Sequence, residues 1–381
     1  PEGCFQNCGK LVTLNLNNTI TSIGDYAFST CQKLSQASAE SLIANTTYIG
    51  DEAFYNCNDI ISVTLPSSLL NIGESAFEGC FDLTTVSLAA NATYEADVFR
   101  KCSKLVTANI PVGMTAIPEG IFSSCGKLAG IEIPNTVVTI GTRAFASCGL
   151  LSLNLPSSVT TIGASAFYGC KFTMLSLPGS ITSIGDDAFN NCTTLNNVML
   201  LSNASIGNNA FDGCSSLTSP VYNAHCFAYM PTSYSGAYSI PEGITVISKQ
   251  MFYGCSNLAA IVLPTTLLSI GEEAFRDCGI SEIVIPEKVS TIANSAFSAC
   301  LNLTSITLPQ SITSVGNSAF YNCKRLKDVY CKPTTPPAGG ANMFDNTANE
   351  RKIYVPQASV ETYKANANWS TYAAAILGYE F

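Results

Sequence analysis

The stretch from Leu303 to Cys323 contains, in order, Leu303-Thr-Ser-Ile306-Thr-Leu308-Pro309, Ile312-Thr-Ser-Val315-Gly316 and Ala319-Phe320-Tyr-Asn-Cys323. Apolar and polar side chains alternate through residues 306–308, which predicts a strand with one face in a core. Pro309 has no amide hydrogen and ends that strand, while Gly316 permits a turn conformation that a side chain would oppose. The residues from 317 to 320 predict one short helical turn that points Phe320 inward.

This unit recurs along the whole chain. Its last part, Phe-x-x-Cys, occurs fourteen times, with successive cysteines 22–26 residues apart except for one gap of 41. A single unit buries too few apolar side chains to offset the entropy of ordering its backbone, so neighbouring units must stack on one another. The sequence therefore predicts a strand-dominated α/β solenoid of about 14–16 coils, with parallel strands on one face and short turns or helical turns elsewhere.

Units such as Ile181-Thr-Ser-Ile184-Gly185-Asp-Asp-Ala188-Phe189-Asn-Asn-Cys192 resemble BspA-like leucine-rich repeats, and the resemblance covers about residues 1–331. That family consists of surface proteins from host-associated anaerobic bacteria and some parasitic protists. The resemblance implies a leucine-rich-repeat solenoid, curved and right-handed, with a strand-lined face. It also implies an exported chain at the cell surface that binds or adheres to a protein or glycan of a host or another microbe.

We expect the solenoid to span residues 1–331 and residues 332–381 to form a degenerate last coil and a C-terminal cap. Because the chain begins partway through a coil, we expect the natural protein to continue upstream. Small residues at Gln36–Glu40 predict a bulge or an edge defect.

An irregular coil is expected at about residues 215–244, inside the 41-residue gap. It has two interpretations. It is either a shortened coil whose space is filled by Phe227 and its neighbours, or an aromatic patch that could stack on a sugar or a peptide. The tyrosines of such a patch would be Tyr222, Tyr229, Tyr234 and Tyr238.

The composition argues against several classes of function. With 47% apolar and 12% charged residues the chain should fold, and its net charge of −9 leaves no basic surface for nucleic acid. No apolar run approaches the roughly 20 residues that a membrane-spanning helix needs. The single histidine, His225, and the lack of paired cysteine spacing predict no metal site, no cofactor and no catalytic residues. We therefore expect a protein that is not an enzyme.

Seventeen cysteines would ordinarily suggest disulfides in an exported protein. Fourteen of them share one repeat position, so we expect an internal column of small apolar fillers. Their Cα–Cβ bonds would run nearly parallel, which favours free thiols. The acidic pair Asp186-Asp187 falls in the turn before Ala-Phe and is expected to be solvated.

A ligand would meet the outward-facing row of the strands, which carries one side chain per coil. This row is polar in its first half and becomes apolar from Met199 to Val284. The candidate ligand-binding residues are Met174, Met199, Val221, Tyr222, Tyr234, Val262 and Val284. The alternative is that the irregular coil or the curvature of the chain covers this stretch. The leading hypothesis is a binding module, and the alternative function is a structural spacer or a self-associating stalk that displays another domain.

Overall fold

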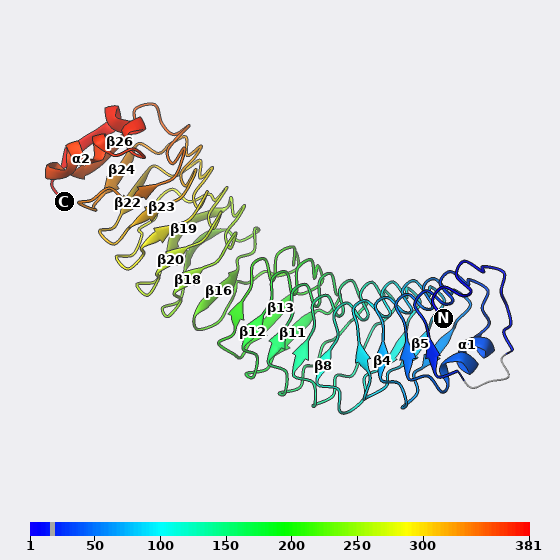
Figure 1. Ribbon diagram of the computed structural model, residues 1–381. Helices are drawn as coiled ribbons and strands as arrows, with labels where there is room; N and C mark the ends of the chain where they lie inside the picture. The colour runs from blue at the N-terminus through cyan, green and yellow to red at the C-terminus, as the bar shows by residue number, and fades with distance from the viewer. Residues whose placement is uncertain (16–19) are drawn as a thin grey trace. The chain divides into compact units, whose positions relative to one another are not determined.

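The computed structural model describes residues 1–15 and 20–381. The chain divides into two compact units, Pro1–Ser216 (unit 1) and Leu217–Phe381 (unit 2). In each unit, short strands from successive coils pair in parallel (Figure 1). Among the described residues, the exception is one antiparallel pair at the start of unit 2. The predicted strand-dominated solenoid is thus confirmed. The predicted boundary between residues 331 and 332 stays a prediction.

Unit 1 has two sets of strands, each at its own position in the repeat. One set consists of two-residue strands that end in the isoleucine before the repeat glycine or at the corresponding position: β1 (Ser22–Ile23), β2 (Tyr48–Ile49), β4 (Asn71–Ile72), β6 (Thr93–Tyr94), β8 (Ala116–Ile117), β9 (Thr139–Ile140), β10 (Thr161–Ile162), β12 (Ser183–Ile184) and β14 (Ser205–Ile206). The second set lies at the predicted strand position: β3 (Ser62–Thr64), β5 (Thr85–Ser87), β7 (Thr107–Asn109), β11 (Met174–Leu177) and β13 (Asn197–Leu200).

Unit 2 repeats this arrangement. Its first sheet contains β15 (Val221–Tyr222), β16 (Cys226–Tyr229), β18 (Val246–Ile247), β20 (Ser269–Ile270), β21 (Thr291–Ile292), β23 (Ser314–Val315) and β25 (Ala338–Gly339). The predicted strand position is taken by β17 (Gly236–Ser239), β19 (Leu258–Val262), β22 (Ser305–Leu308), β24 (Asp328–Cys331), β26 (Lys352–Pro356) and β27 (Ile376–Tyr379). We call the outer side of these longer strands, in either unit, the strand face.

The turn that carries the repeat phenylalanine is not helical, so the predicted helical turn is wrong. Ser318 and Asn322, on either side of Phe320, have left-handed backbones with φ of 54° and 62°. This conformation turns every second N–H toward the next coil, where Phe320 donates to the carbonyl of Met343 at 2.8 Å. A helix would use those N–H groups within its own coil and leave the coils unconnected.

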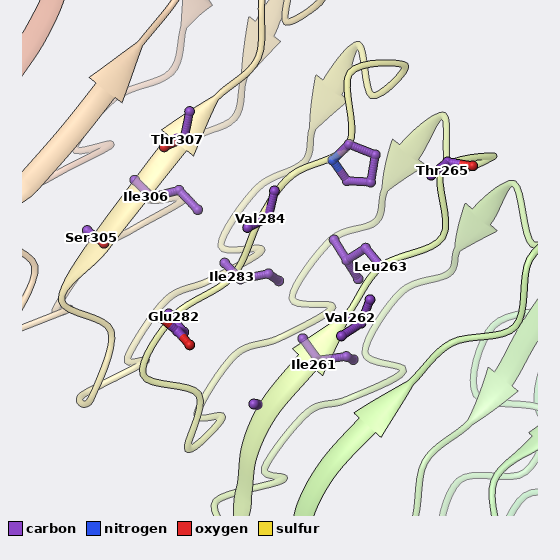
Figure 2. A pocket seen from close by; sticks show the side chains of 12 residues that line it. Ile261, Val262, Leu263, Thr265, Glu282, Ile283, Val284, Ser305, Ile306 and Thr307 are labelled. Atoms are coloured by element: carbon purple, nitrogen blue, oxygen red, sulfur yellow. The ribbon is translucent and has the colours of Figure 1, made fainter.

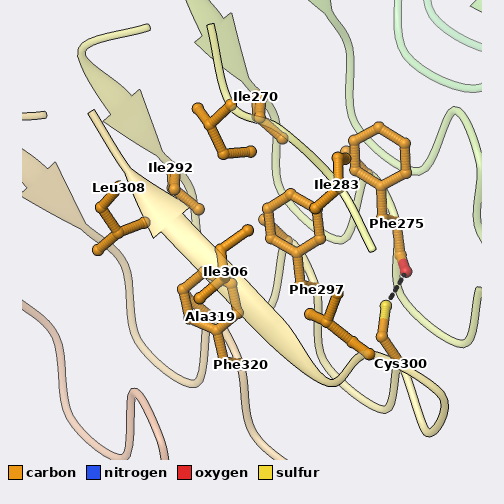
Figure 3. Close-up of a cluster of buried hydrophobic side chains, with 14 of the residues drawn as sticks. Ile270, Phe275, Ile283, Ile292, Phe297, Cys300, Ile306, Leu308, Ala319 and Phe320 are labelled. Carbon is orange, nitrogen blue, oxygen red and sulfur yellow. Dashed lines mark hydrogen bonds between the residues drawn. The ribbon is translucent and has the colours of Figure 1, made fainter. Parts of the chain in front are cut away.

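The phenylalanine rings form the centre of each unit. From Phe5 to Phe211 in unit 1, and from Phe227 to Phe344 in unit 2, successive rings stack with centroids 4.8–6.0 Å apart. Figure 3 shows Phe275, Phe297 and Phe320 in this stack, with isoleucines of the strands packed against them. Such offset stacking adds to the stability that burial of the rings provides.

Thirteen of the repeat cysteines are buried, and none of the seventeen cysteines, all of which lie in the described residues, forms a disulfide. Twelve of the buried thiols donate to the carbonyl of the phenylalanine one coil earlier, with S···O distances of 2.7–3.3 Å. Cys300 and Phe275 form one such pair in Figure 3. The cysteine column therefore links neighbouring coils as well as filling space between them.

The repeat glycine is required by close approach between coils, and the prediction of a special turn conformation was wrong. Gly316 has an ordinary backbone φ, but a Cβ atom there would lie 2.5 Å from the amide nitrogen of Asn294. Gly163 is equally close to Thr142, at 2.6 Å. Atoms at such distances overlap, so a side chain at these positions must push the two coils apart.

Two segments depart from the repeat. At Gln36–Glu40 a bulge or an edge defect was predicted, and the bulge is wrong, because these residues begin a helix, α1 (Gln36–Ile43), whose N-terminus is capped by the hydroxyl of Ser35. The strand of the next coil, β3, is the edge strand of its sheet. At the C-terminus, η1 (Gln357–Ser359), α2 (Val360–Ala365) and η2 (Ser370–Ala375) lie between β26 and β27. Trp369 and Tyr372 from this segment are buried against Phe344, the last ring of the stack, with centroids 6.0 and 5.5 Å away.

Candidate functional site

The strand face of unit 2 carries an open groove of about 500 Å³ (Figure 2). It lies between β19 and β22, over the coil of residues 281–286, which contributes one isolated bridge, Val284 to Thr307, and no longer strand. The groove is lined by Ala260, Ile261, Val262, Leu263, Thr265, Glu282, Ile283, Val284, Pro286, Ser305, Ile306 and Thr307. Its lining is mostly apolar, and Glu282 is the charged residue in it.

Two predicted residues, Val262 and Val284, project from this groove. Their exposed fractions are 62% and 78%, whereas their neighbours Ile261 and Ile283 are each 5% exposed and lie in the core. This alternation follows from the two-residue period of an extended chain, which sends every second side chain outward. The two valines therefore add exposed apolar surface beside the apolar lining of the groove.

Beyond Thr307, the same row continues into tyrosines. Thr307 pairs with Tyr330, and Tyr330 pairs with Tyr354. The rings of Tyr330 and Tyr354 stack at 4.8 Å, and the ring of Tyr379 meets both edge-on at 5.5 Å. Partial burial, and then the carboxylate of Asp328, raise the pKa of both Tyr330 and Tyr354. The row therefore presents neutral hydroxyl-bearing rings at neutral pH.

Sequence reasoning overlooked Tyr354 as a member of this row, and Tyr379 as a ring that packs against it from a position opposite Pro356. Both follow the last repeat cysteine, Cys323, so nothing in the Phe-x-x-Cys period aligned them with the earlier coils. The signal that could have found Tyr354 is the alternation Ile353-Tyr354-Val355, which repeats the pattern of an ordinary coil with the tyrosine facing outward.

In unit 1, Met174 and Met199 are on the strand face, with exposed fractions of 66% and 53%. They come from the paired strands β11 and β13, where Met199 lies opposite Ser176 and Met174 lies opposite Asn197. The two methionines are therefore on the same face but offset by two residues along the strands. Flexible, polarisable methionine side chains adapt to differently shaped partners.

The irregular coil places its predicted residues differently. Val221 is 4% exposed, so the expectation that it faces outward is wrong. The reason is that β15 belongs to the first sheet of unit 2, where it pairs antiparallel with β16, and not to the strand face; there Tyr222 is exposed and Val221 is buried. One face of the Tyr222 ring is stacked on Phe227, with centroids 5.9 Å apart.

Tyr234 is half-buried and its ring meets Tyr238 edge-on at 5.5 Å. Burial raises the pKa of Tyr238 to about 12, with smaller contributions from the neighbouring tyrosines. Tyr238 also meets Phe227 edge-on, at 5.8 Å. These tyrosines therefore pack on the core and on one another, as in the interpretation in which the irregular coil fills its own space.

Polar side chains that could carry chemistry do not converge. His225 is exposed, and its carbonyl accepts a hydrogen bond from the backbone of Thr245. The Asp186 carboxylate accepts a hydrogen bond from the Asn208 amide in the next coil at 2.7 Å, so the residue expected to be merely solvated also joins two coils. Within residues 1–15 and 20–381, no group of three or more His, Cys, Asp or Glu side chains has the arrangement of a metal site.

None of the helices in the described part of the chain has the length and apolar character needed to cross a bilayer.

Comparison with known proteins assigns the repeat independently. A family model described as a BspA type leucine rich repeat region matches the chain in six copies, over residues 1–129, 115–240 and 245–372. A leucine-rich repeat protein from Bacteroides ovatus is 26% identical, with a TM-score of 0.64 and coverage of 93% of this chain and 86% of that one. A leucine rich cell surface protein from Faecalibacterium prausnitzii is 23% identical, with a TM-score of 0.49 and coverage of 97% and 89%. No curated protein matches the chain significantly.

Proposed function

Because this chain belongs to the BspA-type leucine-rich repeat family, a scaffold suited to binding and adhesion, we propose that it is a non-enzymatic binding module of the cell surface. Its ligand is a protein that docks on the strand face of unit 2, at the groove between β19 and β22. The observation that carries this proposal is the pair Val262 and Val284, both largely exposed beside a groove of about 500 Å³.

The lining of the groove favours a protein over a sugar as the ligand. Aliphatic side chains surround the groove, and the polar groups in its lining are the carboxylate of Glu282 and the hydroxyls of Ser305, Thr265 and Thr307. Burying aliphatic surface drives protein association without directional demands, whereas a sugar needs several convergent hydrogen-bonding groups. Met174 and Met199 provide a second, smaller contact surface in unit 1.

The test is binding to an array of host extracellular-matrix proteins, with the chain carrying Val262→Lys and Val284→Lys. Burial of each valine contributes about 1.5–3 kcal/mol, so the double variant should lose at least about tenfold in affinity for its protein ligand. The matched control places the same lysines at Val246 and Leu268 instead. These two residues are 40% and 48% exposed but belong to the β18 and β20 side of the coils. Both variants should melt like the unmodified chain.

Two outcomes would contradict the proposal. One is a ligand whose affinity is unchanged by the two lysines in the groove, and the other is an array on which nothing binds. In the second case, light scattering over a range of concentrations would show whether the chain associates with itself, as the self-associating stalk requires.

A further inference from the structure

The helix α1 occupies the place of a strand next to β3, and one side chain compensates for the missing strand. Gln36 lies at the start of α1, and its side-chain oxygen accepts hydrogen bonds from the amides of Ile61 and Ser62, at 2.7 and 3.0 Å. Its side-chain nitrogen donates to the carbonyl of Ser62 at 2.8 Å. A primary amide offers the same donor and acceptor as a peptide group, so Gln36 replaces one residue of a neighbouring strand.

Gln36 covers only part of this edge. β3 is the outermost strand of the sheet β3-β5-β7, and backbone groups of alternate residues point to alternate sides of a strand. The carbonyl of Ile61 and the amide of Leu65 bond to the β5 side, to the amide of Thr84 and the carbonyl of Ser87, while the amide of Ile61, just before β3 begins, bonds to Gln36. Ser62 therefore faces α1, as its bonds to Gln36 confirm, and the N–H and C=O of Thr64 face the same way.

An open groove of about 400 Å³ lies where a residue paired with Thr64 would be. It is lined by Glu40, Ile43, Ala44, Ser62, Val63, Thr64 and Pro66. In the described part of the chain, no group on the α1 side bonds to the backbone of Thr64. A strand edge with an unused donor and acceptor, beside a groove, is suited to receive an extended chain.

We propose that an extended segment of a partner protein adds to this edge as a further strand, pairing its backbone with Thr64. The segment carries a lysine or arginine that reaches Glu40, and a small aliphatic side chain that covers Ile43 and Ala44. Glu40 is exposed and forms no ion pair within the described residues; its carboxylate accepts one hydrogen bond, from Gln36 at 2.8 Å. The C-terminal end of α1 lies beside it and also favours a cation.

This site is separate from the groove of the proposed function, because it belongs to unit 1 and binds through backbone groups.

The experiment selects ligands from a phage-displayed library of random heptapeptides against the whole chain. The enriched peptides are then synthesised and their affinities measured by fluorescence polarisation. We expect alternating β-branched sequences that contain a basic residue.

Two substitutions at Thr64 separate backbone pairing from side-chain contact. Thr64→Pro removes the amide hydrogen at an edge position, where a sheet tolerates proline, and should weaken binding about tenfold or more. Thr64→Val keeps the amide and should bind like the unmodified chain. Glu40→Gln should weaken binding severalfold at low salt and abolish most of its salt dependence.

A scan of the peptide itself keeps the test valid if the proline variant does not fold. Methylating the backbone nitrogens one at a time should destroy binding at every second position and leave the others nearly unchanged, because alternate N–H groups face the protein. Equal losses for Thr64→Pro and Thr64→Val, a methylation scan without alternation, or a selection that enriches nothing would each overturn the proposal.

Discussion

Raising the pH should unfold unit 1 because its buried thiols must stay protonated while the unit is folded. Burial raises the pKa of Cys80, Cys125 and Cys170 from 9.0 to about 12. In the unfolded chain the same thiols would ionise near their ordinary pKa. A group whose pKa is higher in the folded state stabilises that state fully below the unfolded pKa, and the contribution is lost as the pH rises toward the folded pKa. Stability should therefore be nearly constant around pH 7 and fall between pH 9 and 12.

The size of the effect follows from the difference between the two pKa values. Relative to pH 7, a thiol that ionises only on unfolding lowers the free energy of unfolding by about 1.4 kcal/mol at pH 10. The next pH unit lowers it by about as much again. The three thiols together lower it by about 4 kcal/mol at pH 10, a large part of the 5–15 kcal/mol that is typical of folded domains. Other buried thiols of unit 1, such as Cys57, have raised pKa values and act in the same direction.

The assay is urea unfolding of the whole chain, followed by circular dichroism from pH 7 to 10.5 in a phosphine reductant. The unmodified chain is compared with a variant carrying Cys80→Ala, Cys125→Ala and Cys170→Ala. The variant is less stable at pH 7, but between pH 7 and pH 10 it should lose about 4 kcal/mol less than the unmodified chain. The single variant Cys125→Ala should show about a third of that difference. Equal pH dependence of all three chains would refute the reasoning.

Two further predictions concern packing within the coils, and urea unfolding measures both. Phe297→Ala should cost about 3–5 kcal/mol of stability, because this fully buried ring stacks on a ring at each side, 5.1 and 5.3 Å away. Phe5→Ala, at the half-exposed end of the unit 1 stack, should cost less than half as much. Equal losses of stability would contradict the role of the stack. Gly120→Ala should cost about 2–3 kcal/mol of stability, because Gly120 has a φ of +59° and an added Cβ would overlap the carboxylate of Asp97. Gly126→Ala, where an added Cβ would meet open space, should change stability by less than about 0.5 kcal/mol. A similar loss at both glycines would contradict this reasoning.

Much of the fold could be read from the sequence because its information is periodic. Phe320 and Cys323 recur at a fixed spacing, and the alternation at residues 306–308 marks a strand with one buried face. Each coil is too small to fold alone, so the stacking of coils followed from the energetics of one unit. The exposure of Val262 and Val284 could be predicted for the same reason, since a regular strand fixes which side chains face outward.

The sequence was less informative wherever one coil had to be placed on the next. Ser318 adopts a left-handed backbone, and Gly316 lacks a side chain, because of contacts with residues of neighbouring coils about 22–24 positions away along the chain. Local propensity contains no information about such contacts. The thiols were expected to fill space, but the hydrogen bond from Cys300 to the carbonyl of Phe275 becomes visible only when two coils are stacked. These contacts are non-local, so only the tertiary structure decides them.

The same distinction between sequence and tertiary structure applies to the candidate binding surfaces. The repeat pattern alone placed Val262, Val284 and the two methionines on the strand face. The tertiary structure decided that Val221 is buried, that Tyr354 extends the row, and that Gln36 leaves the edge at Thr64 open. The physical reason is that a side chain's direction within a regular strand depends on its own neighbours in sequence, whereas the sheet that a strand joins, an open edge or a groove depends on which other coil lies beside it.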